Sequence, residues 1–254
     1  MDFLANTWVD NLGGHGGHLF VRNSAITVVL DVFRAGRSWH NGGAVALEGA
    51  QVAMDSVTFQ DSEAAHDGGH FWLARGSHLE ISSSYLGQGL ATAGGAIFSR
   101  DASLLLEGVA MVDHTATESG GVLWAKGGEA VGINLTLLRN TAPLGAAAFL
   151  HEAGLTGVNT LLLEGVGESQ VHTVGTPDVD WSYGLFHEAS GELAGGTLAE
   201  LAGTGLRIAD PLLDENLLPQ AGSPAINAGH PSILDTDGSA SDLGSRGGRR
   251  PWSP

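Results

Sequence analysis

Gly-Gly-Ala-Val at residues 42–45 and Gly-Gly-Ala-Ile at residues 94–97 are two copies of one short unit. The Gly-Gly pair of this unit occurs five times, and each pair lies 26 residues after the previous one. The pairs are Gly16-Gly17, Gly42-Gly43, Gly68-Gly69, Gly94-Gly95 and Gly120-Gly121. A constant spacing over five copies indicates a repeat architecture, in which each repeat is one structural unit that stacks on its neighbours.

The residues that follow each pair indicate strands. They form short apolar runs with many β-branched or aromatic members, whereas a helical repeat would show apolar residues three and four positions apart. Residues 70–73 (His-Phe-Trp-Leu) and 122–125 (Val-Leu-Trp-Ala) are examples. We therefore predict an all-β fold, a right-handed parallel β-helix (solenoid) with about 26 residues per coil, in which equivalent residues of successive coils lie about 4.8 Å apart.

Strand alternation predicts which side chains fill the interior of this solenoid. We expect Ala146-Ala147 to continue the series of pairs, which places one residue of each coil in an inward ladder: Leu19, Val45, Phe71, Ile97, Leu123 and Phe149. A second apolar column keeps the same period at Phe33, Phe59, Tyr85 or Leu86, Met111, Leu137 and Leu163. The Gly-Gly pairs mark a corner at which the backbone needs a positive φ or a close approach to its neighbour.

The chain divides into two parts of one domain. Residues 1–178 carry the regular coils, and residues 179–254 form irregular last coils and a C-terminal capping segment, because the period fades after about Leu163. Solenoids need atypical terminal units, since the open ends of a sheet invite association. Repeat-like sequence begins almost at Met1, so we expect an open strand edge there that permits end-to-end self-association.

Two resemblances to known families rest on these residues. The units at residues 42–45 and 94–97 resemble the Gly-Gly-Ala-Ile motif of polymorphic outer membrane protein repeats. Residues 137–140 and 3–6 keep the asparagine of the accompanying Phe-x-x-Asn motif, which is degraded in other coils. Between Val179 and Gly248, the blocks at residues 210–212, 221–229 and 235–244 resemble the C-terminal region of bacterial surface β-helix proteins of the choice-of-anchor Q class. These resemblances imply an extracellular or cell-surface location.

Charge and composition exclude several classes of partner. The formal net charge is −17, and Lys126 is the only lysine, so the chain repels the phosphate backbone of nucleic acids and anionic membrane surfaces. There are no cysteines, which excludes disulfides and thiolate metal sites. No apolar run approaches the length of about 20 residues that spans a bilayer, and residues 1–11 lack the features of a signal peptide. We expect no membrane insertion.

An outward aromatic row is the candidate ligand-binding site. If the first ladder faces inward, the next residue of each coil faces outward: Phe20, Ala46, Trp72, Phe98, Trp124 and Leu150. Trp72, Phe98 and Trp124 would then form an exposed strip suited to sugar rings or to a partner protein. Two alternatives are that another segment covers these rings, or that the alternation is reversed.

Asp235, Asp237, Ser239 and Asp242 are candidate Ca²⁺ ligands, because hard cations prefer clustered oxygen atoms around a turn. The alternative is a turn in which Asp and Ser side chains accept hydrogen bonds from local backbone N–H groups. His66 and His70 suggest a metal site, with His40 stacked on His66, but a solvated polar edge is the plainer interpretation.

The sequence favours a non-catalytic, secreted or surface-displayed β-helix that binds a neutral glycan or a protein partner, in the adhesin or passenger class. One alternative is a polysaccharide-degrading lyase or hydrolase, although no residue set supports it and fold alone does not establish function. A second alternative is a purely structural stalk. Carboxylates along one outer groove would favour the enzyme, and an exposed aromatic row would favour binding.

Overall fold

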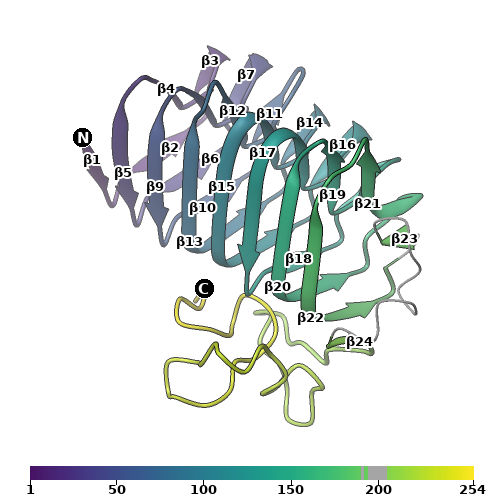
Figure 1. Ribbon diagram of the computed structural model, residues 1–254. Coiled ribbons are helices and arrows are strands. Elements are labelled where there is room, and N and C mark those ends of the chain that lie inside the picture. Colours follow the sequence, from purple (N-terminus) through teal and green to yellow (C-terminus); the bar gives the residue numbers. More distant parts are fainter. Residues whose placement is uncertain (190–191, 194–204) are drawn as a thin grey trace.

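The computed structural model describes residues 1–189, 192–193 and 205–254, and shows parallel strands stacked as a β-solenoid of about eight turns (Figure 1). Each turn takes about 26 residues, which confirms the predicted fold class of a parallel β-helix. Within these described ranges there is no helix, and hence none long and apolar enough to cross a membrane.

Equivalent strands of successive coils pair in parallel and form four rows. The first row follows the Gly-Gly pairs and contains β4 (Leu19–Arg22), β8 (Val45–Glu48), β12 (Phe71–Ala74), β15 (Ile97–Val112), β17 (Leu123–Ile133), β19 (Ala148–His151), β21 (Ser169–Val174) and β23 (Glu192–Leu193). The second row contains β1 (Asp2–Leu4), β5 (Ala25–Val29), β9 (Gln51–Asp55), β13 (His78–Gly87), the continuations of β15 and β17, β20 (Gly154–Leu163) and β22 (Val179–His187).

The third row contains β2 (Thr7–Val9), β6 (Val32–Arg34), β10 (Thr58–Gln60), β18 (Thr136–Leu138), β24 (Leu206–Ile208) and the last residues of β13, β15, β20 and β22. The fourth row is a separate sheet of β3 (Leu12–His15), β7 (Arg37–Asn41), β11 (Glu63–Ala64), β14 (Leu90–Ala93) and β16 (Thr115–Ser119). It leads back to the next Gly-Gly pair, so a coil has a corner between each row and the next.

The Gly-Gly pairs form the corner between the fourth and first rows, as predicted. The first glycine of each pair adopts a left-handed backbone, with φ of +64° at Gly94 and +70° at Gly68. The second glycine lies against the backbone of the next coil, and a Cβ on Gly69 would approach the carbonyl oxygen of Gly95 to 2.1 Å. Real Cβ contacts are longer than this, so both positions require glycine for different reasons.

The inward ladder is confirmed from Leu19 through Leu123, and Phe71 and Ile97 at its centre are fully buried. Phe149 was wrongly placed in it. Leu123 pairs with Ala148, because the next corner is Gly145-Ala146 and this coil is one residue shorter. In the second column the inward residues are Leu86 and Leu162, where Phe59 pairs with Leu86 and Leu137 with Leu162. Leu163 therefore faces the other side of the wall.

His18 and His70 each follow a Gly-Gly corner, and His114 lies at the corner between the third and fourth rows. His70 and His114 are fully buried with their rings 5.2 Å apart, and His18 is half-buried. Burial lowers the pKa of His18 to about 4 and that of His114 to about 3, and it lowers the pKa of His70 well below its usual value. All three imidazoles are therefore neutral at pH 7, as desolvation disfavours their charged form.

The C-terminal segment (residues 209–254) lies along the side of the coils, against the third row, and leads back toward earlier coils (Figure 1). The capping role of this segment stays a prediction, and its described part covers outward apolar residues of the third row. They are Ala110, Val112, Leu138, Leu161, Leu163 and Leu185, and they pack against Leu217, Ala225, Ala228 and Leu243. Residues 190–191 and 194–204, which we included in the 179–254 region, lie outside the described residues.

Side-chain hydrogen bonds attach this segment to the coils. The buried Asn134 donates to the carbonyl oxygens of Asp242 and Gly244, and the backbone N–H of Ser245 donates to the Thr136 hydroxyl. Arg250 donates to the Ser82 hydroxyl at 2.8 Å. Arg250 is therefore part of this attachment.

Candidate functional site

The outer aromatic row exists and continues further than predicted. Trp72 pairs with Phe98, Phe98 with Trp124, and Trp124 with Phe149, so the predicted alternation is correct. Phe149 takes the place that we gave to Leu150, because of the shortened coil, and His172 follows it. The rings stack along the solenoid axis, with centroids 4.4 Å apart for Phe98 and Trp124 and 5.9 Å apart for Trp124 and Phe149.

This stacking leaves little ring surface for a ligand. Trp72 and Trp124 are half-buried, and Phe98 is only 2% exposed, so the expectation of three exposed rings is wrong for Phe98. The planes of Phe98 and Trp124 differ by 3°, and the guanidinium of Arg100 lies 5.3 Å from the Phe98 ring centroid. Sugars stack on ring faces, but the rings of Phe98 and Trp124 turn their faces to one another. The row is therefore suited to stabilising the coil stack.

The histidines of the fourth row form a similar ladder at the outer edge. His40 stacks on His66 with centroids 5.9 Å apart, as predicted, and His15 extends the stack at 5.2 Å from His40. These three rings are exposed, whereas His70 is buried on the opposite side of the corner. In the part of the chain that the structure describes, no three His, Cys, Asp or Glu residues are grouped so that they could hold a metal ion.

Backbone N–H groups hold the carboxylates of the predicted Ca²⁺ loop in place. Asp235 accepts hydrogen bonds from the backbone N–H groups of Asp242 and Gly248. Asp237 accepts from the backbone N–H and the hydroxyl of Ser239, and these bonds lower the pKa of its carboxyl. Asp242 accepts from the N–H of Asn227 at 2.7 Å. Each carboxylate thus serves a different backbone donor, which supports the turn interpretation over calcium binding.

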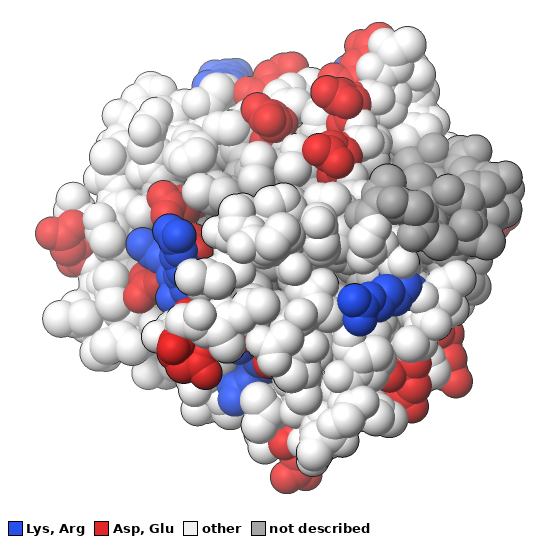
Figure 2. All heavy atoms as spheres, turned by 60° about the horizontal axis from the view of Figure 1, so that its bottom comes forward, with Lys and Arg blue, Asp and Glu red and all other residues white. Residues whose placement is uncertain are grey.

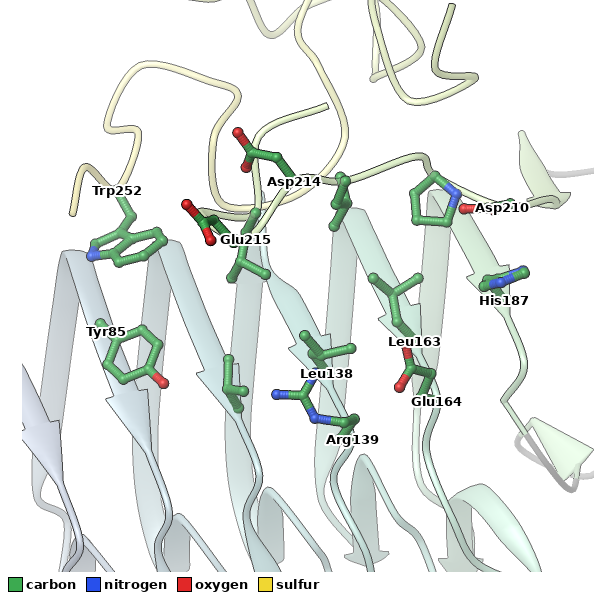
Figure 3. A pocket seen from close by; sticks show the side chains of 14 residues that line it. Tyr85, Leu138, Arg139, Leu163, Glu164, His187, Asp210, Asp214, Glu215 and Trp252 are labelled. Atoms are coloured by element: carbon green, nitrogen blue, oxygen red, sulfur yellow. The ribbon is translucent and has the colours of Figure 1, made fainter. Parts of the chain in front are cut away.

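A cleft of about 450 Å³ lies between the third row and the C-terminal segment (Figure 3). Its volume is in the range of small-molecule binding sites. The coils contribute Tyr85, Val112, Leu138, Arg139, Leu163, Glu164 and His187. The C-terminal segment contributes Asp210, Pro211, Leu213, Asp214, Glu215, Leu217 and Trp252.

Aromatic rings close one end of this cleft. Trp252 from the C-terminal segment meets Tyr85 of β13, with ring centroids 5.4 Å apart and planes tilted by 32°. Arg246 holds Trp252 in place through two contacts. Its guanidinium lies 5.5 Å from the centroid of the indole ring and donates a hydrogen bond to the Trp252 carbonyl oxygen. Burial, followed by the nearby Asp113 carboxylate, raises the pKa of the Tyr85 phenol. Tyr85 therefore stays a neutral hydroxyl that can donate or accept a hydrogen bond.

Charged groups occupy the walls of the cleft. Arg139 follows β18 and pairs with Asp113 of the preceding coil through two hydrogen bonds of 2.7 and 3.0 Å. These bonds raise the pKa of Arg139, which stays charged. Glu164 occupies the equivalent position one coil further, and Figure 3 shows it on the coil wall with Glu215 on the opposite wall. Both glutamates are exposed, and neither forms an ion pair with a described residue.

Two aspartates shape the wall that the C-terminal segment provides. Asp210 accepts a hydrogen bond from the N–H of Leu212, and Asp214 accepts from the N–H groups of Asn216 and Leu218. They hold the turns that present Glu215. None of the four lining carboxylates is buried, so their free oxygens can reach a ligand in the cleft. The arrangement is suited to binding through hydrogen bonds, charge and ring contacts.

This cleft was not predicted from the sequence. Its lining residues come from separate coils and from a distant segment, and they share no motif. A signal was present in the third row, where Val112, Leu138 and Leu163 are outward apolar residues at regular spacing and require a covering segment. The comparisons match this chain to no protein-family model, no curated protein and no solved structure.

Proposed function

We propose that this protein is a non-catalytic β-helix that binds a glycan without acidic groups in the cleft between the third row and the C-terminal segment. The observation that carries the proposal is the composition of the cleft. Trp252 and Tyr85 stand at one end, apolar side chains line its floor, and carboxylates on both walls can accept hydrogen bonds from hydroxyl groups.

Charge selects among possible ligands. Figure 2 shows the face that carries the C-terminal segment, where acidic groups lie mostly toward the margin and basic groups lie beside some of them and nearer the centre. The formal charge of −17 opposes uronate-rich or sulfated glycans and nucleic acids. A neutral or basic saccharide meets no such repulsion.

The resemblance of residues 42–45, 94–97 and 210–244 to bacterial surface proteins supports an extracellular or cell-surface location and the adhesin or passenger class. We propose that the β-helix displays the cleft, while the outer aromatic row of Trp72, Phe98 and Trp124 stabilises the coils that carry it. A protein partner bound through this row is the competing proposal.

A glycan array tests the proposed function. The wild-type protein should bind a group of non-acidic glycans, Trp252→Ala should lose that binding, and Trp39→Ala should keep it. Trp39 is a matched control, because it is 65% exposed in β7 and does not line the cleft. An array without any glycan above background, or equal binding by Trp252→Ala, would contradict the proposal.

The carboxylate-lined cleft is also the feature that favours a polysaccharide-degrading enzyme. The two proposals differ in what happens to the ligand. A bound oligosaccharide should be recovered intact by chromatography after prolonged incubation. Shortened products, or products with an unsaturated end, would replace the binding proposal by the enzyme.

A further inference from the structure

The cleft carries an excess of negative charge over its described lining. Four acidic residues line it: Glu164, Asp210, Asp214 and Glu215. Arg139 is the one lysine or arginine in that lining, and Asp113 already pairs with it. His187 lies 3.8 Å from Glu188, so the imidazole has its own acidic neighbour outside the lining. The cleft is therefore complementary to a ligand with positive charge.

A bare metal ion does not fit this arrangement. The described residues contain no group of three acidic or histidine side chains that could hold a metal. Asp210 and Asp214 use side-chain oxygens to accept backbone N–H groups of their own turns. Glu164 and Glu215 are on opposite walls, so they are placed to contact separate cationic groups of one larger ligand (Figure 3).

The other lining residues are mostly apolar or aromatic, so the ligand must also present C–H groups to them. Val112, Leu138, Leu163, Leu213 and Leu217 form apolar surface between the charged walls, and Trp252 and Tyr85 close one end. A ligand that fills the cleft must combine C–H surface with spaced cationic groups. Ammonium groups satisfy the carboxylates through charge-assisted hydrogen bonds, and sugar rings supply the C–H faces.

We propose that the ligand is an amino sugar oligosaccharide whose protonated amino groups contact Glu164 and Glu215. This inference rests on the proposed function, because it names the kind of glycan that the same cleft binds. Acetylation of the amino groups removes their charge and keeps the sugar backbone, so the acetylated oligosaccharide is a matched neutral probe.

Calorimetric titration at about pH 6 and low salt tests the inference with three probes. They are a glucosamine oligosaccharide, the N-acetylglucosamine oligosaccharide of equal length, and an oligolysine of similar charge. The glucosamine oligosaccharide should bind about tenfold more tightly than the acetylated one, and added salt should weaken it. Glu164→Gln and Glu215→Gln should each weaken it about three- to tenfold.

Glu129→Gln is the control variant, because Glu129 is exposed in β17 and does not line the cleft. Its affinity should equal that of the wild-type protein, and circular dichroism checks that every variant folds. Equal or tighter binding of the acetylated probe would overturn the inference that the ligand carries positive charge, and it would still support the proposed function of glycan binding. Binding of oligolysine alone would overturn the choice of a saccharide, and unchanged affinity in both glutamine variants would overturn the placement of the amino groups. No binding by any of the three probes would overturn the inference, while the glycan array tests the proposed function separately.

Discussion

His114 makes the stability of this protein sensitive to acid. Its side chain is fully buried, and burial lowers its pKa from 6.5 to about 3. Below about pH 6.5 the unfolded chain takes up a proton on this residue, whereas the folded protein does so only near pH 3. Since the unfolded state binds more protons in this window, the free energy of unfolding falls as the pH falls. The folded protein therefore has its full stability with respect to His114 above about pH 6.5, and this contribution is lost progressively as the pH falls to about 3.

The size of the effect follows from these two pKa values. One proton corresponds to about 1.4 kcal/mol per pH unit, so a change from pH 7.5 to pH 5 lowers the free energy of unfolding by about 2 kcal/mol through His114 alone. His70 is also fully buried and its pKa is lowered, so it adds to the loss in the same direction. A domain with a total stability of about 5–15 kcal/mol loses a large fraction of it.

Urea unfolding followed by circular dichroism at these two pH values measures the loss. His114→Gln cannot take up the proton, so its free energy of unfolding should change less between the two pH values than that of the wild-type protein, by about 2 kcal/mol. His40→Gln is the surface control, because His40 is exposed in the outer histidine ladder. The same pH dependence in His114→Gln and in the wild-type protein would refute the reasoning.

Four further predictions concern the coils and the C-terminal loop. Ile97→Ala should lower the free energy of unfolding by about 2–5 kcal/mol in urea, because Ile97 is fully buried in the inward ladder. Gly94→Ala should cost at least about 1–2 kcal/mol, since φ is +64° and the added Cβ would approach the Ile97 carbonyl oxygen to 2.3 Å; an unchanged unfolding midpoint would contradict this. Trp124→Ala should lower stability by about 2 kcal/mol through lost stacking while glycan affinity stays the same. The melting temperature in millimolar calcium should equal that in chelator, because the Asp235 carboxylate already accepts hydrogen bonds from backbone N–H groups. A higher melting temperature in calcium would support the calcium site instead.

The fold could be predicted because one physical requirement recurs in every coil. Gly68 and Gly94 have a left-handed backbone, and Gly69 and Gly95 lie close to the backbone of the next coil. Because each coil repeats these two requirements, Gly-Gly pairs recur in the sequence about every 26 residues. The error at Phe149 arose where the requirement weakened. The second position of that corner is Ala146, and the shortened coil removed the period that the prediction relied on.

The site could be predicted only in part, because its properties depend on packing between distant segments. Alternation placed Trp72, Phe98 and Trp124 on the outer face, but it carries no information on ring orientation, and the rings of Phe98 and Trp124 stack on one another. The cleft is formed by residues of separate coils together with Glu215 and Trp252 from the C-terminal segment. No local pattern in the sequence specifies that this segment returns along the side of the solenoid.

Fluorine NMR of protein labelled with fluorotryptophan tests the central claim most directly, because the six tryptophans report separately on the cleft and on the outer row. The signals of Trp72, Trp124 and Trp252 are assigned by replacing each residue with phenylalanine in turn, and a glucosamine oligosaccharide is then added. We predict that the Trp252 signal shifts with increasing ligand and that the signals of Trp72 and Trp124 do not move. A shift of Trp72 or Trp124 with Trp252 unchanged would contradict the account and assign the ligand to the outer aromatic row.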